Sequence, residues 1–227
     1  MNISIFGLGY VGAVTAACVA RDGHYAIGVD VEPAKVNAIN SGSSPIVEDS
    51  IDALIACAVE AGRLRATSDV KSAVRETDVG IVCVGTPSRP NGSLDTAYVE
   101  KITREIGCAL RDHAPDRPFL FVLRSTVLPG TVRQLVLPVL ADAAAAPPGS
   151  SFDVVFHPEF LREGSAVRDY DEPPKIVIGE RVPSCGSALK ALYSGFDAEI
   201  FEVPLEVAET VKYADNIFHA LKITLRT

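Results

Sequence analysis

The fold is decided by the stretch that runs from Asn2 to Gly12, NISIFGLGYVG, and by the helix-like segment that follows it. Five residues with the character of a buried strand lead into the spacing GxGxxG, and residues 10–21 are then rich in Ala and Val. In this context Gly7 permits a tight turn, Gly9 lets a pyrophosphate approach the main chain, and Gly12 lets the helix pack against the strand. The stretch predicts a strand, a dinucleotide-binding turn and a helix.

A carboxylate further along supports this interpretation. Asp30 ends a second expected strand and lies 18 residues after Gly12. Dinucleotide-binding domains place the acid that binds the adenosine ribose about 20 residues on. A carboxylate there would repel the 2′-phosphate of NADP, so the sequence predicts NAD as the cofactor.

Strand-like and helix-like segments alternate through the rest of the chain. We expect strands at residues 2–6, 25–30, 79–84, 119–123, 152–156, 175–178 and 198–201, and helices at residues 10–21, 33–40, 50–61, 95–111, 131–144 and 187–193. Several strands are continuously apolar, as a parallel sheet covered on both faces requires. The order predicts an α/β fold: a doubly wound, mostly parallel, Rossmann-like sheet over residues 1–203. We interpret residues 143–151 as a surface loop within this domain.

The character of the chain changes at Pro204. Residues 205–225 predict one long amphipathic helix, with Glu206 and Glu209 in its first turns, where the helix dipole favours negative charge. This helix is still apolar where the sequence ends. We therefore expect residues 204–227 to be the truncated start of a second domain, whose remainder is missing or is supplied by another chain.

Composition excludes several classes of function. The 227 residues include 21 Lys and Arg against 29 Asp and Glu, and 48% of them are hydrophobic. A net charge of −8 argues against nucleic-acid or anionic-membrane partners, which need a basic surface. The apolar N-terminus has no basic residue before it and is interrupted by glycines, which is not typical of a signal peptide. We expect a cytoplasmic globular protein with no membrane partner.

Cysteine and histidine usage indicates neither disulfides nor a metal. The five cysteines are scattered, without a CxxC pair, and the four histidines form no HxxxH pair. Such cysteines suit a reducing compartment. We expect no metal site.

Polar residues follow three of the expected strands. Thr86 lies in a Gly-Thr-Pro segment after residues 79–84, where it could face the cofactor or simply form a turn. Thr126 follows residues 119–123, where its hydroxyl could contact the nicotinamide ribose or cap the next helix. Glu159 and Glu163 follow residues 152–156. They could divide acid–base work, or they could begin a charged helix.

Two further polar residues lie on the terminal helix. Lys212 and Asn216 are four residues apart and therefore share one helix face. A cation and an amide together could stabilise a developing oxyanion. The alternative is a solvated polar stripe.

Taken together and in this order, segments along essentially the whole chain resemble the UDP-glucose/GDP-mannose dehydrogenase family. The segments are ISIFGLGYVG, IGVDV, SPIVE, VCVGTP, NGSLD, RSTVLPGT, PEFLREG and VAETVKYADNIFHALKI. The combination is far more specific than any one motif. Within the family, the first and third segments and DYDEPP look most like members that act on GDP-mannose, and next like those that act on UDP-glucose.

The resemblance implies oxidation of the C6 alcohol of a nucleotide sugar to a carboxylate, with two hydrides passed to NAD. It implies NAD contacts from Gly7, Gly9, Tyr10, Val11, Gly12, Asp30, Lys35, Thr86, Thr126 and Glu163. Glu159 would be the acid–base residue or would position water, while Lys212 and Asn216 would hold the oxyanion. The sugar pocket would be lined by Phe160, Leu161 and Arg162. Because family dimers pack through the long helix, we expect a homo-oligomer.

The sequence departs from the family pattern in three places. The family nucleophile is a cysteine in a later GGSC-type segment, and no cysteine here matches that context. Residues 222–227 read KITLRT where the family helix continues with Asn-Glu, and His157 replaces a more usual Asn. Without the thiol, the thioester route to the acid fails. We therefore expect the N-terminal part of such an enzyme, inactive by itself.

Two alternatives stay open. The chain could be a binding module that binds NAD and catalyses nothing. It could also be a different Rossmann dehydrogenase acting on a small hydroxy acid, although that reading does not explain PEFLREG together with Lys212 and Asn216.

Overall fold

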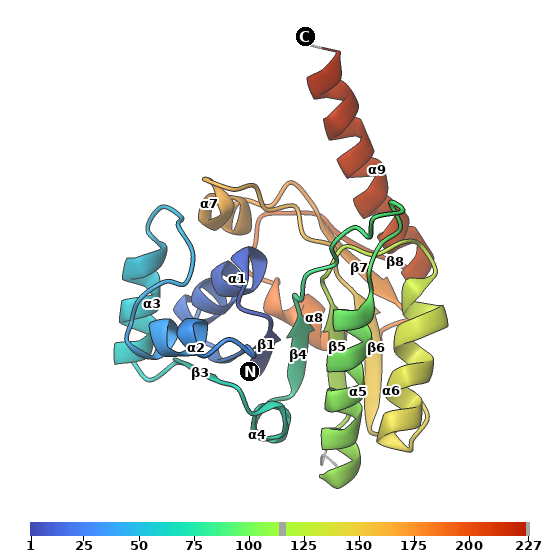
Figure 1. Ribbon diagram of the computed structural model, residues 1–227, viewed down its shortest axis with the longest axis horizontal. Helices are drawn as coiled ribbons and strands as arrows, with labels where there is room; N and C mark the ends of the chain where they lie inside the picture. Colours follow the sequence, from blue (N-terminus) through green and yellow to red (C-terminus); the bar gives the residue numbers. More distant parts are fainter. Residues whose placement is uncertain (114–116, 226–227) are drawn as a thin grey trace.

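A computed structural model describes residues 1–113 and 117–225 (Figure 1). Within this part of the chain, eight strands form one sheet. They are β1 (Asn2–Phe6), β2 (Tyr25–Val29), β3 (Leu64–Thr67), β4 (Val79–Val82), β5 (Phe119–Leu123), β6 (Phe152–Phe156), β7 (Ile176–Glu180) and β8 (Ile200–Pro204). Their order is β3-β2-β1-β4-β5-β6-β7-β8, and every neighbouring pair is parallel except β6 and β7. The predicted doubly wound, mostly parallel sheet is confirmed.

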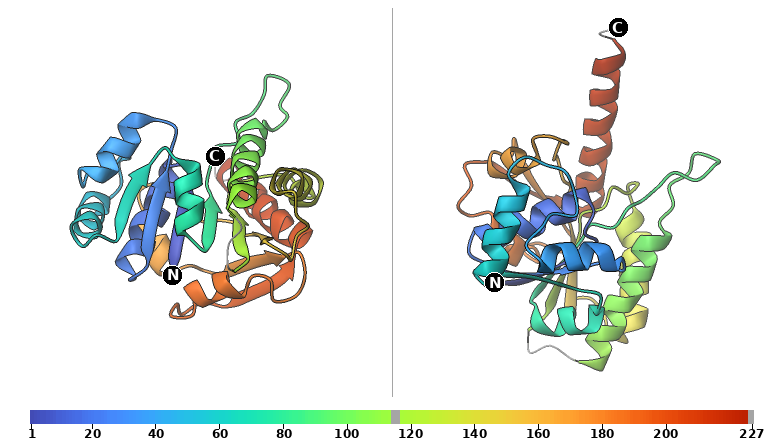
Figure 2. Two further views of the ribbon diagram at one scale, coloured as in Figure 1. Left: turned by 90° about the horizontal axis from the view of Figure 1, so that it is seen from below. Right: turned by 60° about the vertical axis from the view of Figure 1, so that its left-hand side comes forward.

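Helices cover both faces of this sheet (Figures 1 and 2). They are α1 (Tyr10–Arg21), α2 (Pro33–Asn40), α3 (Ile51–Glu60), α4 (Val70–Glu76), α5 (Ala97–Asp112), α6 (Leu137–Ala144), α7 (Ala166–Asp171), α8 (Ser187–Leu192) and α9 (Leu205–Thr224), and a π-helical turn, η1 (Val132–Val136), precedes α6.

The central strands contribute to two cores because their side chains alternate between the faces of the sheet. In β5, Phe119, Phe121 and Leu123 join the core beneath α4, α5 and α6. Leu120 and Val122 face the other way, into the core beneath α1, α3, α7 and α8. Burial on both faces explains why the central strands are continuously apolar.

The direction in which the chain adds strands to the sheet reverses between the parallel strands β1 and β4, and the candidate site lies at this point. From β1 the chain adds β2 and β3 on one side, and from β4 it adds the remaining strands on the other. The loops that follow β1 and β4 therefore separate at the carboxyl edge of the sheet. In open α/β sheets this is the position of the ligand crevice.

Helix α9 begins packed against the sheet and then leaves it. A Cβ on Gly179 of β7 would lie 2.6 Å from Cβ of Ala208, so the glycine allows the first turns of α9 to sit directly on the strand. The second half projects from the body (Figures 1 and 2) and exposes apolar side chains, with Phe218 69% exposed. The helix was predicted at residues 205–225. The departure from the family sequence at residues 222–227 falls partly on residues 226–227, which lie outside the described residues.

Three elements and one local geometry were not predicted. The segment 62–78 holds β3 and α4, and α7 precedes β7. The helix expected at residues 131–144 begins as η1 instead. The strands expected at 25–30 and 79–84 end one and two residues earlier, and those expected at 175–178 and 198–201 lie at Ile176–Glu180 and Ile200–Pro204. In the described ranges no helix is both long and apolar enough to cross a membrane.

Candidate active site at the carboxyl edge of the sheet

The three glycines of the first turn have different structural roles. Gly7 has a positive φ of 96°, and its N–H donates to the main-chain oxygen of Val29 at 2.7 Å. A Cβ on Gly12 would lie 1.8 Å from the main-chain oxygen of Gly7, so only glycine lets α1 begin this close to the turn. Around Gly9, a Cβ would meet nothing within 4 Å. The space beside Gly9 is therefore open to a ligand at the N-terminus of α1.

Asp30 lies at the end of β2, in front of this turn. Its buried carboxylate accepts hydrogen bonds from the main-chain N–H groups of Leu8 at 2.7 Å and Glu32 at 2.9 Å. Nζ of Lys35 lies 3.5 Å from the same carboxylate. The structure thus brings together Asp30 and Lys35, which were both expected to contact NAD.

A cleft of about 520 Å³ joins these residues to the loop after β4. Its lining includes Gly7, Gly9, Asp30, Lys35, Cys83 and Gly85. The open space over Gly9 and the fixed carboxylate of Asp30 suit a pyrophosphate and a ribose hydroxyl respectively. The residues present therefore fit an NAD molecule.

The two predicted threonines meet at the same edge. Oγ1 of Thr86 donates to the main-chain oxygen of Thr126 at 2.8 Å, and Oγ of Ser125 donates to the main-chain oxygen of Val84 at 2.6 Å. These bonds tie the loop after β4 to the loop after β5. Neither threonine is fully buried, so both remain candidates for ligand contact.

The second part of the site is a buried ion pair. Nζ of Lys212 lies 2.8 Å from Oε1 of Glu159 and also donates to the main-chain oxygen of Glu159 at 2.7 Å. The side chains are only 8% and 13% exposed. The interpretation of Lys212 as part of a solvated stripe is therefore wrong. So is a helix start at Glu159, because α7 begins only at Ala166.

A cleft of about 680 Å³ lies beside this pair and is lined by Lys212. Its lining includes the predicted sugar-pocket residues Phe160, Leu161 and Arg162, together with Lys175, Lys212, Asp215 and Asn216. Asn216 is exposed one turn beyond Lys212 on α9. Lys175, which the sequence analysis missed, lies with Nζ 4.2 Å from the centre of the Phe160 ring and 3.2 Å from Asp215.

His157, the first residue after β6, is a buried neutral histidine near the Lys212–Glu159 pair. Nδ1 of His157 lies 2.8 Å from the main-chain oxygen of Val177, and Nε2 lies 3.0 Å from the hydroxyl of Tyr193. Arg124 donates to the same hydroxyl at 3.0 Å. Burial, reinforced by the charge of Arg124, lowers the pKa of His157 to about 3. His157 is therefore uncharged at neutral pH, with Nδ1–H donating to the carbonyl.

Glu209 has a role that the sequence analysis did not identify. Its fully buried carboxylate accepts from the N–H groups of Gly130 at 2.6 Å and Val132 at 2.8 Å, at the start of η1. Burial raises the pKa of Glu209 above its ordinary value, although both hydrogen bonds oppose the shift. The residue stabilises the N-terminus of another helix rather than that of α9. It thereby attaches α9 to the loop that carries Thr126.

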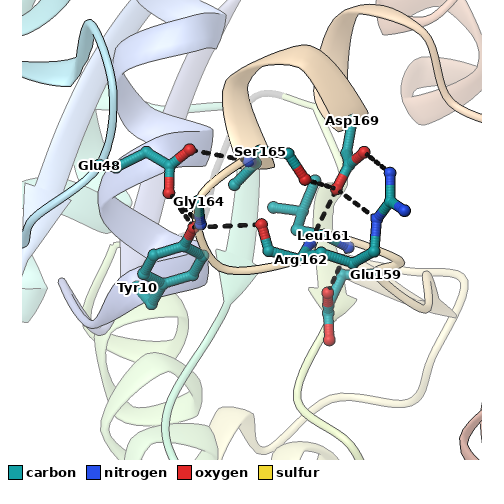
Figure 3. A network of polar contacts seen from close by, with 9 residues as sticks. Tyr10, Glu48, Glu159, Leu161, Arg162, Gly164, Ser165 and Asp169 are labelled. Carbon is teal, nitrogen blue, oxygen red and sulfur yellow. Dashed lines mark hydrogen bonds and ion pairs between the residues drawn. The ribbon is translucent and has the colours of Figure 1, made fainter. Parts of the chain in front are cut away.

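Tyr10, at the start of α1, contacts the β6–α7 loop, residues 157–165, which also contains Glu163. The hydroxyl of Tyr10 donates to Glu48, which Figure 3 shows beside Gly164. Glu163 is exposed, and its charge contributes to the raised pKa of Tyr10, about 12, which is due first to burial and then to Glu48. Arg162 is turned toward Asp169, with Nη2 2.6 Å from Oδ1.

Among the described cysteines, Cys83 lines the cofactor cleft. Burial raises the pKa of Cys83 to about 12, so the side chain is a thiol at neutral pH. The others lie in or near helices away from that cleft: Cys18, Cys57, Cys108 and Cys185. In the described ranges, no group of three or more His, Cys, Asp or Glu residues could hold a metal ion.

Comparison with known proteins places this arrangement in context. Residues 1–197 match the model described as "UDP-glucose/GDP-mannose dehydrogenase family, NAD binding domain". A GDP-mannose 6-dehydrogenase of Pseudomonas putida is 51% identical over 99% of this chain and 51% of its own length. A UDP-glucose 6-dehydrogenase of Bacillus subtilis is 36% identical over 98% of this chain and 47% of its own length.

Solved structures of dehydrogenases that act on nucleotide sugars are also similar to this chain. A ternary complex of GDP-mannose dehydrogenase from Pseudomonas aeruginosa superposes with a TM-score of 0.96 at 49% identity, over 99% of this chain and 51% of that one. A UDP-glucose dehydrogenase from Pyrobaculum islandicum has a TM-score of 0.93 at 40% identity, over 98% of this chain and 50% of that one. The chain thus spans about half the length of the relatives it matches.

Proposed function

This chain belongs to the UDP-glucose/GDP-mannose dehydrogenase family, whose NAD-binding domain it contains, and we propose that it forms the cofactor-binding part of a nucleotide-sugar 6-dehydrogenase. The reaction would oxidise the C6 alcohol of the sugar to a carboxylate in two steps. GDP-mannose is the first candidate because a GDP-mannose 6-dehydrogenase shares 51% identity with the chain, whereas a UDP-glucose 6-dehydrogenase shares 36%.

The observation that carries this proposal is the contact between Lys212 and Glu159 at the carboxyl edge of the sheet. Two acceptors on Glu159 occupy two of the three ammonium donors of Lys212, which leaves one for a ligand in the cleft shared with Asn216. A cation and an amide at this place would stabilise an alkoxide that forms at C6. Glu159 would take up the proton or hold the attacking water.

The cofactor would lie along the first cleft. The turn containing Gly9 would hold the pyrophosphate and Asp30 the adenosine ribose, with Lys35 beside it. Thr86, Thr126 and Glu163 would hold the nicotinamide end. When bound, NAD accepts the hydride that leaves C6.

The sugar would lie in the second cleft, beside the ion pair. Phe160, Leu161 and Arg162 line this cleft and would set the orientation of the sugar. The proton-transfer and oxyanion-binding groups of the proposed reaction would thus come from the β6–α7 loop and from α9.

We propose that the described cysteines take no part in forming the acid. Cys83 faces the cofactor cleft but is held as a thiol by burial, and a thiol is a poor nucleophile. A nucleophile for the second oxidation would therefore come from outside the described residues. The alternative function is a module that binds NAD without turnover.

We also propose a division of the chain near residue 203 and self-association through α9. The projecting half of that helix exposes Ile217, Phe218, Leu221 and Ile223, which a partner would cover. Sedimentation of the chain before and after Phe218→Glu tests this proposal. A monomeric unmodified chain would contradict it.

The function is tested by calorimetric titration of the purified chain with NAD, and by following NADH absorbance with excess NAD and either GDP-mannose or UDP-glucose. The expected result is NAD binding by a folded chain without completion of both oxidations. Two NADH per sugar would contradict the assignment of the cysteines, and the active sugar would name the substrate. A folded chain that does not bind NAD would contradict the proposed function.

A further inference from the structure

Glu48 lies between α2 and α3, and its side chain contacts the first residue of α1 and the end of the β6–α7 loop. Its carboxylate accepts hydrogen bonds from the Tyr10 hydroxyl, from the N–H of Gly164 at 2.8 Å and from the N–H of Ala166 at 2.9 Å (Figure 3). Three donors thus converge on one side chain. They come from the first residue of α1 and from the junction of the β6–α7 loop with α7.

These contacts require the ionised form of Glu48. Oε2 accepts from Tyr10 and Gly164, while Oε1 accepts from Ala166. Desolvation, the largest single contribution, would raise the pKa of Glu48, but the three hydrogen bonds outweigh it and lower that pKa. An amide in place of the carboxylate would direct its own N–H₂ at one set of donors and lose those bonds.

Tyr10 connects the start of α1 to the β6–α7 loop. Its hydroxyl also accepts from the N–H of Gly164 at 3.0 Å and lies 3.2 Å from the main-chain oxygen of Arg162. The same residue begins α1 directly after Gly9, where the cleft opens. One side chain therefore links the dinucleotide turn to the loop that carries Glu159 and Arg162.

The loop itself has little regular structure to hold it. Gly164 adopts a positive φ of 82°, in the region that favours glycine. Asp169 restrains the far side by accepting from the N–H of Arg162 at 2.9 Å and from Oγ of Ser165 at 3.1 Å. Among the described residues, Glu48 and Tyr10 provide the side-chain contacts that restrain Gly164.

We propose that Glu48 is a positioning residue that sets the β6–α7 loop relative to the cofactor. Through Tyr10 and Gly164 it fixes the turn that directly follows Arg162 and Glu163. Glu48 thereby fixes the position of the cofactor contact Glu163 relative to the sugar contact Arg162, without itself contacting the cofactor or the sugar. This inference rests on the proposed function, because it assigns Glu163 to the cofactor.

The test compares the chain with Glu48→Gln, Tyr10→Phe and the control Glu60→Gln. Glu60 is an exposed glutamate at the end of α3, so the control makes the same chemical change away from the loop. Amide exchange of Gly164 and Ala166 is measured by NMR, and NAD affinity by calorimetry. A melting curve of each variant confirms that it is folded.

In Glu48→Gln, the exchange of the Gly164 and Ala166 amides is expected to accelerate about 10-fold to 100-fold, as the loss of a hydrogen bond to a charged group allows. The dissociation constant for NAD is expected to rise about 5-fold, at the low end of coupling between linked sites. Tyr10→Phe should accelerate exchange of the Gly164 amide. Glu60→Gln should change neither the amide exchange nor the dissociation constant for NAD.

Two results would overturn the inference. One is unchanged exchange and NAD affinity in Glu48→Gln. The other is faster exchange with unchanged NAD affinity, which would make Glu48 a purely structural residue. If the unmodified chain binds no NAD, the proposed function fails, and with it the role of Glu48 toward the cofactor, whereas the exchange data still report on the loop.

Discussion

The ammonium group of Lys212 lies 2.8 Å from a carboxylate oxygen of Glu159 and 2.7 Å from the main-chain oxygen of the same residue. These contacts join α9 to the loop after β6, over 53 residues of sequence. Because both side chains are nearly buried, each charge depends on the other for its solvation. The long helix is therefore attached to the carboxyl edge of the sheet by the residues proposed to carry the chemistry.

Replacing Lys212 by Met should leave the Glu159 carboxylate buried without its cation. We expect the free energy of unfolding to fall by about 3 kcal/mol, as when one partner of a buried pair is removed. Urea denaturation followed by circular dichroism measures the change.

Two further variants control this prediction. The double variant Lys212→Met with Glu159→Gln should recover part of the loss, because no uncompensated charge remains. Asn216→Ala, an exposed change one turn away, should alter stability by less than about 0.5 kcal/mol. An unchanged free energy of unfolding in Lys212→Met would show that the pair is not formed in solution.

His157 should make the chain sensitive to acid. Its folded-state pKa of about 3 lies below the ordinary value of 6.5, so the unfolded chain binds the proton more readily between these values. The stabilisation is fully present above pH 6.5 and decreases as the pH falls toward 3. Between pH 7.5 and pH 5, this residue alone should reduce the free energy of unfolding by about 2 kcal/mol.

Urea denaturation at both pH values, for the chain and for His157→Asn, isolates the contribution of the imidazole. Asn cannot titrate, so the variant should lose about 2 kcal/mol less on acidification. Equal losses in the two proteins would mean that His157 is solvated or charged in the folded state.

Asp30 should make the chain prefer NAD over NADP. Its carboxylate is fixed by Leu8 and Glu32 at the end of β2, where a 2′-phosphate would meet a like charge. We expect NADP to bind at least about 10-fold more weakly, because such like-charge contacts cost several kcal/mol. Calorimetric titration with each dinucleotide measures the ratio. Asp30→Asn should reduce the ratio of NAD affinity to NADP affinity. Equal affinities for the two dinucleotides in the unmodified chain would contradict a role of Asp30 in selecting NAD.

The sequence was informative where local pattern and burial agree. Helix α1 and strands β1, β5 and β6 have the predicted bounds, because apolar runs bounded by turn residues define them. The segment with β3 and α4 was missed because β3 is four residues long and only alternately buried. The π-helical turn η1 could not be predicted, since its geometry depends on contacts such as that of Gly130 with the distant Glu209.

The site shows the same division. The order of the strands brings Gly9, Asp30 and Thr86 to one edge. Spacing along the sequence predicted Gly9 and Asp30, whereas it left Thr86 open between a cofactor contact and a simple turn. The contacts of Glu48 and Tyr193 form only after folding, because their partners lie 118 and 69 residues away in the sequence: the main-chain N–H of Ala166 and the guanidinium of Arg124. Glu48 is the last residue of the SPIVE segment, but nothing local in the sequence indicates its contacts or those of Tyr193. Their role follows only from the three-dimensional arrangement.

The central claim is that the Gly7–Gly12 turn holds NAD, and one pair of variants separates this from folding. A Cβ at Gly9 would meet no atom of the chain, whereas one at Gly12 would lie 1.8 Å from the main-chain oxygen of Gly7. Gly9→Ala should therefore change the free energy of unfolding by less than about 1 kcal/mol. Gly12→Ala should prevent α1 from packing and destabilise the whole domain.

The decisive measurement is calorimetric titration of the folded Gly9→Ala variant and the unmodified chain with NAD. The account predicts that the unmodified chain binds NAD and that Gly9→Ala, equally folded, binds it at least about 10-fold more weakly because the methyl group occupies the position of the pyrophosphate. Equal NAD affinity in the two proteins would contradict it.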